Sequence, residues 1–445
     1  MDWKNWKKGL CGVFAAGCLL VWGGAAPLQA SDAELIELLR QKNLITQEEA
    51  DRMLKKASAA AEKEKQQMKA SVAEDLKKDA AKGEFLPSAL KGVKLSSTIF
   101  AGWEGTNRHP AGNNQNANTG SNANKFYLDR AYLTVSKDVN HWLGMRFTAD
   151  LFRDTHDVAN NGLELRVKYA YADLKFFGTS TKAGMVPTPS DSYDGSIYPY
   201  RVQGKHFLDA YGIQSSADLG VVNSGAFGGN MDKEYLKYGN RSFGGKWGGW
   251  MVGLYNGTGY DRDETNTNKV ASGLIYIRPL PTVSILKGLQ VAYVGTYGLS
   301  NSNFTAANLP PGKKLTDYPD WRSHILQASL VHPYFAVMGQ YYWGVGQKTS
   351  NDEKNRKGYL AAGYVRIPYV EKLRVFGKYY TMDPDTDLTA TQAKTKNEYA
   401  VYVAGLSYDW SKELMPFIAW EREDNKRHSA RVDYDRYQIG FQLNF

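Results

Sequence analysis

Residues 434–445 read YDRYQIGFQLNF, and apolar and polar side chains alternate along this stretch. Successive side chains of a β-strand point to opposite faces, so this strand has one apolar face and one polar face. The apolar face carries Tyr437, Ile439, Phe441, Leu443 and Phe445, and the other carries Arg436, Gln438, Gly440, Gln442 and Asn444. Such a strand separates an apolar medium from water.

The rest of the 445-residue chain limits what that medium can be. No run of 18 or more apolar residues occurs beyond the N-terminus, which excludes a helical membrane protein. A transmembrane β-barrel needs no such run, because only every second residue of its strands faces lipid. The 29 tyrosines, 11 tryptophans and 43 glycines suit the aromatic girdles and turns of a barrel, although a soluble β-sandwich shares them.

Residues 1–30 have the pattern of a secretory signal peptide. Three lysines precede an apolar stretch over residues 9–22, and small residues follow, so we expect cleavage near Ala30. Both cysteines, Cys11 and Cys18, lie in this segment. A lipoprotein signal ending at Cys18 is an open alternative. The mature chain would hold no cysteine and therefore no disulfide.

Residues 31–91 predict a periplasmic helical segment and a linker. Ser31 with Glu34, and Thr46 with Glu49, form two capping boxes, which mark the starts of helices. Ala61 and Met68 continue a thin, coiled-coil-like apolar seam. The segment is either a stalk that associates with itself or the cell wall, or a solvated helical linker.

From residue 92 to 445 the sequence predicts one antiparallel barrel of 16–18 strands. Short turns alternate with long polar connections, as in transmembrane barrels. Dividing residues 219–246 into strands over 220–228 and 235–244 would give 18 in place of 16. The sixteen predicted strands cover 92–105, 125–137, 141–153, 164–177, 180–187, 207–218, 247–256, 267–279, 288–299, 321–332, 334–346, 358–369, 371–382, 397–410, 414–423 and 434–445.

Several features together resemble the phosphate-selective porin family of Gram-negative bacteria. They are the signal peptide, the helical preface, the strand Phe126-Tyr127-Leu128-Asp129-Arg130-Ala131-Tyr132-Leu133, and Ala183-Gly184-Met185-Val186-Pro187 at the end of a strand. The resemblance implies a 16-stranded trimeric channel with inward-folded loops and a basic path for anions such as phosphate. A terminal Phe445 also looks like the residue that the barrel assembly machinery reads in outer-membrane proteins.

The charges favour an anion path independently. The net charge is +9, of which residues 1–91 supply +2, so the barrel carries +7. A basic side chain on the lipid face costs roughly 2–4 kcal/mol, so these side chains are expected in the lumen, where they attract anions. The strand candidates are Arg130, Arg146, Arg374, Lys378 and Arg436, with Arg166 and Lys168 weaker because the alternation there is unclear. Each could instead simply pair with a lumen carboxylate such as Asp150.

The connection over residues 188–206 is the candidate constriction. It is the third long loop, which in general porins folds inward, and it carries Tyr198, Tyr200, Arg201 and Lys205. It also carries aspartates, so a transverse field with little net selectivity, or a plain surface loop, are alternatives.

Catalytic and metal sites have little support. The seven histidines show no metal-binding spacing, and no GxSxG motif occurs. We therefore expect a non-enzymatic outer-membrane porin without cofactor or metal, which contacts lipid and small anions and binds no nucleic acid. The alternatives are a structural tether to the cell wall and a barrel sheath for an electron-transfer partner.

Overall fold

The computed structural model describes residues 40–74 with gaps, and residues 90–109, 123–153, 162–387, 398–425 and 433–445. The chain divides into two units, one up to Val93 and one from Lys94 to Phe445. None of the helices in the described residues is long and apolar enough to cross a membrane.

The first unit is helical where it is described. Residues 47–53 are helical, and the box at their start is formed: Thr46 N–H donates to Glu49 Oε2 at 2.9 Å, and Glu49 N–H donates to Thr46 Oγ1 at 3.3 Å. This reciprocal pair satisfies backbone donors that no helical bond reaches, which confirms the second predicted capping box. The signal peptide, the first capping box, Ala61 and Met68 lie outside the described residues.

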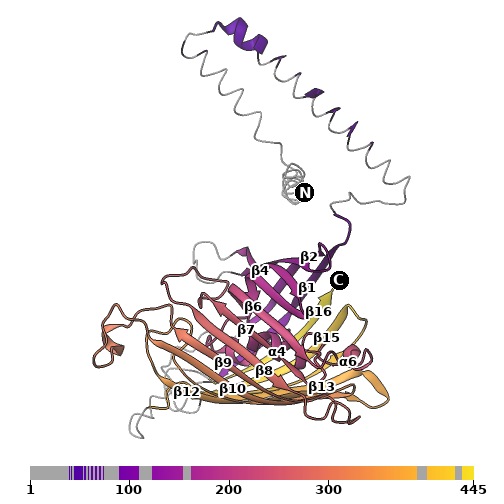
Figure 1. Cartoon of the computed structure of the whole chain (residues 1–445), viewed down its shortest axis with the longest axis vertical. Coiled ribbons are helices and arrows are strands. Elements are labelled where there is room, and N and C mark those ends of the chain that lie inside the picture. Colours follow the sequence, from indigo (N-terminus) through magenta and orange to yellow (C-terminus); the bar gives the residue numbers. More distant parts are fainter. Residues whose placement is uncertain are drawn as a thin grey trace. The chain divides into compact units, whose positions relative to one another are not determined.

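The second unit is a closed antiparallel barrel of sixteen strands, each paired with its neighbours in the chain, and the first paired with the last (Figure 1). The strands are β1 (Val93–His109), β2 (Asn124–Asp138), β3 (Leu143–Arg153), β4 (Leu163–Phe176), β5 (Thr179–Pro187), β6 (Ala217–Phe227), β7 (Gly248–Tyr255), β8 (Val270–Ile277), β9 (Leu289–Leu299), β10 (Asp320–His332), β11 (Phe335–Val345), β12 (Asn355–Ile367), β13 (Val370–Asp383), β14 (Tyr399–Tyr408), β15 (Leu414–Asn425) and β16 (Asp433–Asn444).

The predicted strand over 207–218 is wrong, and so is the 18-strand alternative. Residues 207–210 form the short helix α5 (Phe207–Ala210), and Gly212 has a φ of +66°, which interrupts any strand. The strand between β5 and β7 is instead β6 (Ala217–Phe227), which matches the strand over 220–228 in the 18-strand alternative. The segment proposed as an eighteenth strand, 235–244, contains the helix α6 (Tyr235–Tyr238). Phe207 and Leu208 are buried inside the barrel, so their apolar character reflects packing of a loop rather than a strand face.

The two faces of the barrel wall differ in polarity, as the alternation in residues 434–445 predicted. On β16, Tyr437 and Ile439 point outward and are half exposed, whereas Gln438 points inward and is buried. Exposed aliphatic and aromatic side chains cover the outer face of most strands, and Ser, Thr, Gln, Lys and Arg gather on the inner face. A closed wall of this kind leaves no unpaired strand edge.

The unclear alternation of residues 164–177 has a structural cause. In the pairing of β3 with β4, Thr148 lies opposite Tyr169 and Ala149 opposite Val167, so Lys168 is an extra residue. This β-bulge shifts the phase of β4, because the residues on either side of it alternate in different registers. The exposed Leu165 and Val167 on one side, and the buried Lys168, fit this arrangement.

Candidate functional site

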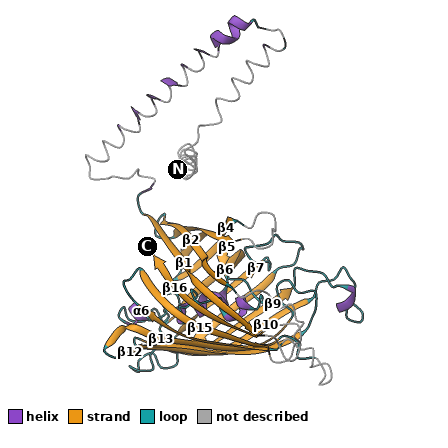
Figure 2. Cartoon of the chain, turned by 180° about the vertical axis from the view of Figure 1, so that it is seen from behind, coloured by secondary structure: helices purple, strands orange, loops and turns teal. Residues whose placement is uncertain are grey.

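The connection between β5 and β6, residues 188–216, folds into the barrel, and we call it the inner loop. Its helix α4 (Pro189–Ile197) lies within the ring of strands, as Figures 1 and 2 show. Pro189 at the helix start suits a position that needs no N–H donor. The Tyr193 hydroxyl donates to Gln290 Oε1 of β9 at 3.0 Å, and Gln340 Nε2 of β11 donates to Asp194 Oδ1 at 2.6 Å. These bonds fix α4 against one side of the wall.

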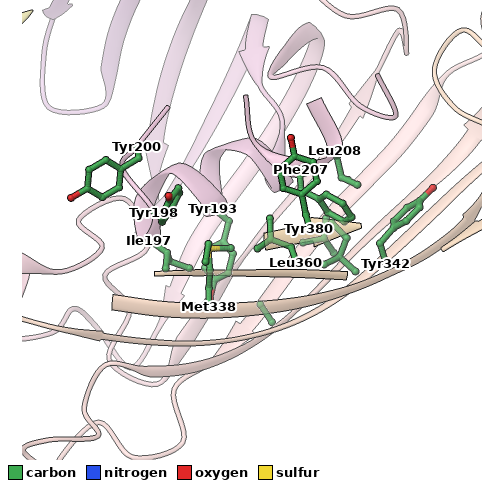
Figure 3. Packing of buried hydrophobic residues seen from close by; sticks show 14 of the residues in the cluster. Tyr193, Ile197, Tyr198, Tyr200, Phe207, Leu208, Met338, Tyr342, Leu360 and Tyr380 are labelled. Carbon is green, nitrogen blue, oxygen red and sulfur yellow. The ribbon is translucent and has the colours of Figure 1, made fainter. Parts of the chain in front are cut away.

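Apolar packing holds the inner loop to the same side. Figure 3 shows Tyr193 and Ile197 of α4 close to Met338 of β11, and all three are buried. The ring of Tyr200 stacks on Phe376 of β13, with centroids 4.0 Å apart. A stacked aromatic pair contributes about 0.5–1.5 kcal/mol beyond its buried area.

One inward-facing position of β12 is a glycine, and this lets the loop approach. A Cβ on Gly358 would lie 2.8 Å from the Phe207 ring and 2.6 Å from the Thr381 carbonyl oxygen. The absence of a side chain there leaves room for Phe207, which also packs edge-on to Tyr380 with centroids 5.9 Å apart. The loop is therefore seated by shape as well as by hydrogen bonds.

A buried ionic cluster braces the loop from within. The Arg201 guanidinium donates to both Asp191 and Asp209, the second at 2.7 Å, and His206 Nδ1 lies 2.8 Å from Asp191 Oδ1. Burial alone would raise the pKa of Asp191, but the charge of Arg201 and the interaction with His206, including their hydrogen bond, outweigh it and lower that pKa. Burial lowers the pKa of His206. Arg201 thus neutralises two carboxylates and closes the loop on itself.

The space that the loop leaves open is a cavity of about 1350 Å³. Residues 202–205 and 210–211 border it on one side, and β1–β4 and β13–β16 on the other. Among the described residues, its lining holds seven basic and seven acidic side chains: Lys125, Arg130, Arg166, Lys205, Arg262, Lys378, Arg436, Glu104, Asp129, Asp150, Asp261, Asp263, Glu421 and Glu423. The lining is charged but balanced, so any selectivity depends on which charges are neutralised locally.

Five of the predicted residues line this cavity: Arg130, Arg166, Lys205, Lys378 and Arg436. The arginines are paired, Arg130 with Asp129 at 3.1 Å, Arg166 with Asp150 at 2.9 Å and Arg436 with Glu421 at 2.7 Å. Lys205 and Lys378 differ from them, since no carboxylate of the described residues lies within ion-pairing distance of either, and Lys378 Nζ donates to the Lys205 carbonyl at 3.4 Å.

The other predicted residues lie away from the cavity. Tyr198 and Tyr200 of the inner loop are buried, and Arg201 is occupied by its two aspartates, so none of the three lines the cavity. Arg374 pairs with Asp409 near a turn. Arg146 faces the barrel interior, where it donates to Thr148 Oγ1 at 3.1 Å.

Sequence reasoning gave too little weight to Lys168 and missed Tyr132. Lys168 Nζ donates to the Tyr132 hydroxyl at 3.0 Å and to Ser216 Oγ at 3.2 Å, and Arg130 donates to the same tyrosine oxygen at 2.7 Å. Two cations therefore converge on one hydroxyl beside the cavity. The bulge at Lys168 hid this, because it breaks the alternation on which the assignment of faces depends.

Asp194 makes the loop sensitive to pH. An aspartate ordinarily has a pKa of about 3.9, and burial, followed by the charge of Asp191, raises the pKa of Asp194 to about 8. Because the folded state holds this proton more tightly, the associated stability is complete below about pH 4 and is lost as the pH rises through 8. We expect Asp194→Asn, which stays neutral, to raise the thermal transition at pH 9 by several degrees and to change it little at pH 4.

The measurement is thermal unfolding in detergent at pH 4, 7 and 9, with the exposed Glu371→Gln as the control. A wild-type transition that is the same at pH 4 and pH 9 after subtraction of the change seen in Asp194→Asn would contradict a buried, neutral Asp194.

Comparisons with known proteins bear on the fold. No protein-family model and no curated protein matches the chain. Among solved structures, OprB of Pseudomonas putida is similar with a TM-score of 0.54 and 10% identity, over 80% of this chain and 94% of that one. An anion-selective porin from Comamonas acidovorans has a TM-score of 0.51 and 12% identity, over 79% and 99%. OmpT of Vibrio cholerae, an outer membrane protein in a trimer form, has 0.50 and 12%, over 79% and 99%. The chain has the fold of these barrels.

Proposed function

We propose that this protein is an outer-membrane porin, a water-filled channel for the passive diffusion of small hydrophilic solutes. The observation that carries the proposal is the charged cavity inside a closed wall whose outer face is apolar. Side chains fill the narrow interior of an eight-stranded barrel, whereas sixteen strands enclose a wider interior. The inner loop narrows that interior but leaves a cavity that is bordered mainly by polar and charged residues.

The location and assembly that we propose follow from the same fold. An apolar outer face and a polar inner face suit the outer membrane of a Gram-negative bacterium, reached through the N-terminal signal peptide. The trimer form of the Vibrio cholerae protein supports a homotrimer. We further propose that Phe445 serves as the assembly signal and that residues 31–91 form a periplasmic segment ahead of the barrel.

Our proposal includes a preference for anions. Paired arginines contribute little net field, whereas Lys205 and Lys378 have no described carboxylate partner and face or border the cavity. A positive charge in a narrow space between low-dielectric walls lowers the energy of a passing anion. The anion-selective porin from Comamonas acidovorans has the same fold, which is consistent with this preference. Phosphate is the solute to examine first, on the resemblance described above.

The test is a planar-bilayer recording of the purified protein under a KCl gradient, repeated with added phosphate. We expect stepwise conductance in groups of three, an anion-selective reversal potential, and a reduced chloride current when phosphate is present. Cation selectivity would overturn the anion preference, and the absence of conductance from folded protein would overturn the channel itself.

A further inference from the structure

The outer surface of β9–β12 carries an ordered patch of side chains at its long-loop end. In the strand registers, Tyr297, Arg322 and Asn355 share the row nearest the loops. The next row holds His324, Trp343 and Lys357, and the row below it holds Tyr293, Leu326, Tyr341 and Tyr359. Farther along come Val291, Leu330 and Val337. Rows two residues apart are separated by about 7 Å, so charge gives way to aromatic and then aliphatic side chains over about 20 Å.

The aromatic part of this patch is pre-arranged. The Trp343 ring stacks on His324, with centroids 5.1 Å apart, and also on Tyr341, with centroids 5.4 Å apart. The Tyr293 hydroxyl lies 2.6 Å from His324 Nδ1, and the Tyr341 and Tyr359 rings are 5.1 Å apart. These contacts link side chains of four strands into a continuous surface with a fixed shape.

Above the aromatic rings lies a groove of about 340 Å³, bordered by Arg322, Lys357, Asn355 and Thr386 as well as Trp343 and Tyr341. Arg322 is half exposed and pairs with Asp320 at 3.0 Å at the protein surface. Lys357 is exposed, and no carboxylate of the described chain lies within ion-pairing distance of it. Adjacent strands lie about 4.8 Å apart, so the two cations, on β10 and β12, are close enough to converge on one anion.

We propose that this patch binds a phosphorylated lipid of the outer leaflet, with its phosphate on Arg322 and Lys357 and its acyl chains on the rows below. The inference rests on the proposed function for the position of the barrel in the membrane, in which long loops face outward. An arginine guanidinium and a lysine ammonium suit a phosphate, to which the Thr386 hydroxyl can also donate. The aromatic rings lie at the depth of the lipid headgroups, and Val291 and Val337, farther from the loops, face the hydrocarbon.

The pattern matches a lipid better than a free anion. A phosphate ion would use only the cations at the top of the patch, whereas a lipid also covers the exposed aliphatic side chains farther along, where Val291 is 37% and Val337 49% exposed. Single exposed apolar residues are common on any surface, but their order beneath two cations gives the patch the same polarity gradient as a phospholipid or lipid A molecule.

The experiment is a native mass spectrometry titration of the full-length protein in a mild detergent. The probes are phosphorylated lipid A, dephosphorylated lipid A and inorganic phosphate. We expect tight binding of the phosphorylated lipid only, and roughly 30-fold weaker binding by the double variant Arg322→Ala/Lys357→Ala, because two cations at an anionic headgroup are lost. Arg322→Lys/Lys357→Arg keeps both charges and should retain binding.

Lys372→Ala/Lys412→Ala is the matched control, because it removes two exposed lysines near the exposed Trp410 at the other end of the barrel. Unchanged lipid binding by the Arg322/Lys357 double variant overturns the proposal, and so does equally tight binding of inorganic phosphate or of dephosphorylated lipid A. Bilayer conductance of the same variant separates the two proposals: we expect it to be unchanged, and a protein that binds lipid without conducting would overturn only the channel.

Discussion

Replacing Arg201 by methionine is expected to loosen the inner loop and to enlarge the conductance step. Arg201 is the partner of both Asp191 and Asp209, and all three side chains are largely buried. Removing one member of a buried ion pair costs about 3–5 kcal/mol, because the remaining charge is left without compensation. Bilayer recordings would show larger and noisier steps, and limited proteolysis would cut within residues 188–216.

The control for this prediction also removes the two carboxylate charges that Arg201→Met leaves without a partner. Arg201→Met/Asp191→Asn/Asp209→Asn should recover much of the wild-type behaviour, because replacing all members of a buried ionic cluster costs far less than removing one. Arg241→Ala, at an exposed arginine whose Nε donates to the Leu236 carbonyl, should have no effect on conductance. If Arg201→Met conducts as the wild type does and resists protease, the cluster does not hold the loop.

The second large effect is expected on ion selectivity. Lys205→Glu combined with Lys378→Met should turn an anion-preferring channel into a cation-preferring one. Lys205 is exposed to the cavity, and Lys378 lies beside it with its Nζ on the Lys205 carbonyl. A unit charge a few ångströms from an ion changes its energy by about 1 kcal/mol even at high dielectric, so the permeability ratio should shift by about tenfold or more.

The measurement is the reversal potential under a KCl gradient. The neutral pair Lys205→Gln/Lys378→Met should give an intermediate value, and Lys412→Glu, at an exposed turn outside the cavity, should give the wild-type value. Arg436→Gln is a further comparison: its partner Glu421 would be left unpaired, so we expect a change of the same sign. A reversal potential that does not respond to Lys205 and Lys378 would place the selective region elsewhere.

The barrel could be predicted from sequence because its decisive property repeats in every strand. Alternation reports which of two media a side chain faces, and it needs no knowledge of distant contacts. The prediction was wrong where contacts with other parts of the chain, rather than the two media, decided which side chains are buried. The apolar residues of 207–218, including Phe207 and Leu208, are buried by a loop inside the barrel, and the bulge at Lys168 shifts the phase within a strand.

The site was harder to predict than the wall. Alternation correctly predicted that Arg130, Lys378 and Arg436 face inward. It could not show that the two arginines have carboxylate partners and that Lys378 has none among the described residues. Such pairing depends on which strands are neighbours and on their register. For the same reason, Tyr200 looked like a cavity residue, although its stacking on Phe376, far away in the sequence, removes it from the path.

The seam between β1 and β16 also has a kinetic consequence. It joins residues such as Thr98 and Asn444, whose side chains are hydrogen-bonded at 3.0 Å across a separation of 346 positions. Contacts this distant in sequence form slowly, because the entropy of closing so long a loop must be overcome first. Until β16 is in place, two strand edges are open to pairing with other chains. The unassembled protein should therefore depend on chaperones, and the loss of β16 alone should direct the whole chain to aggregation or degradation.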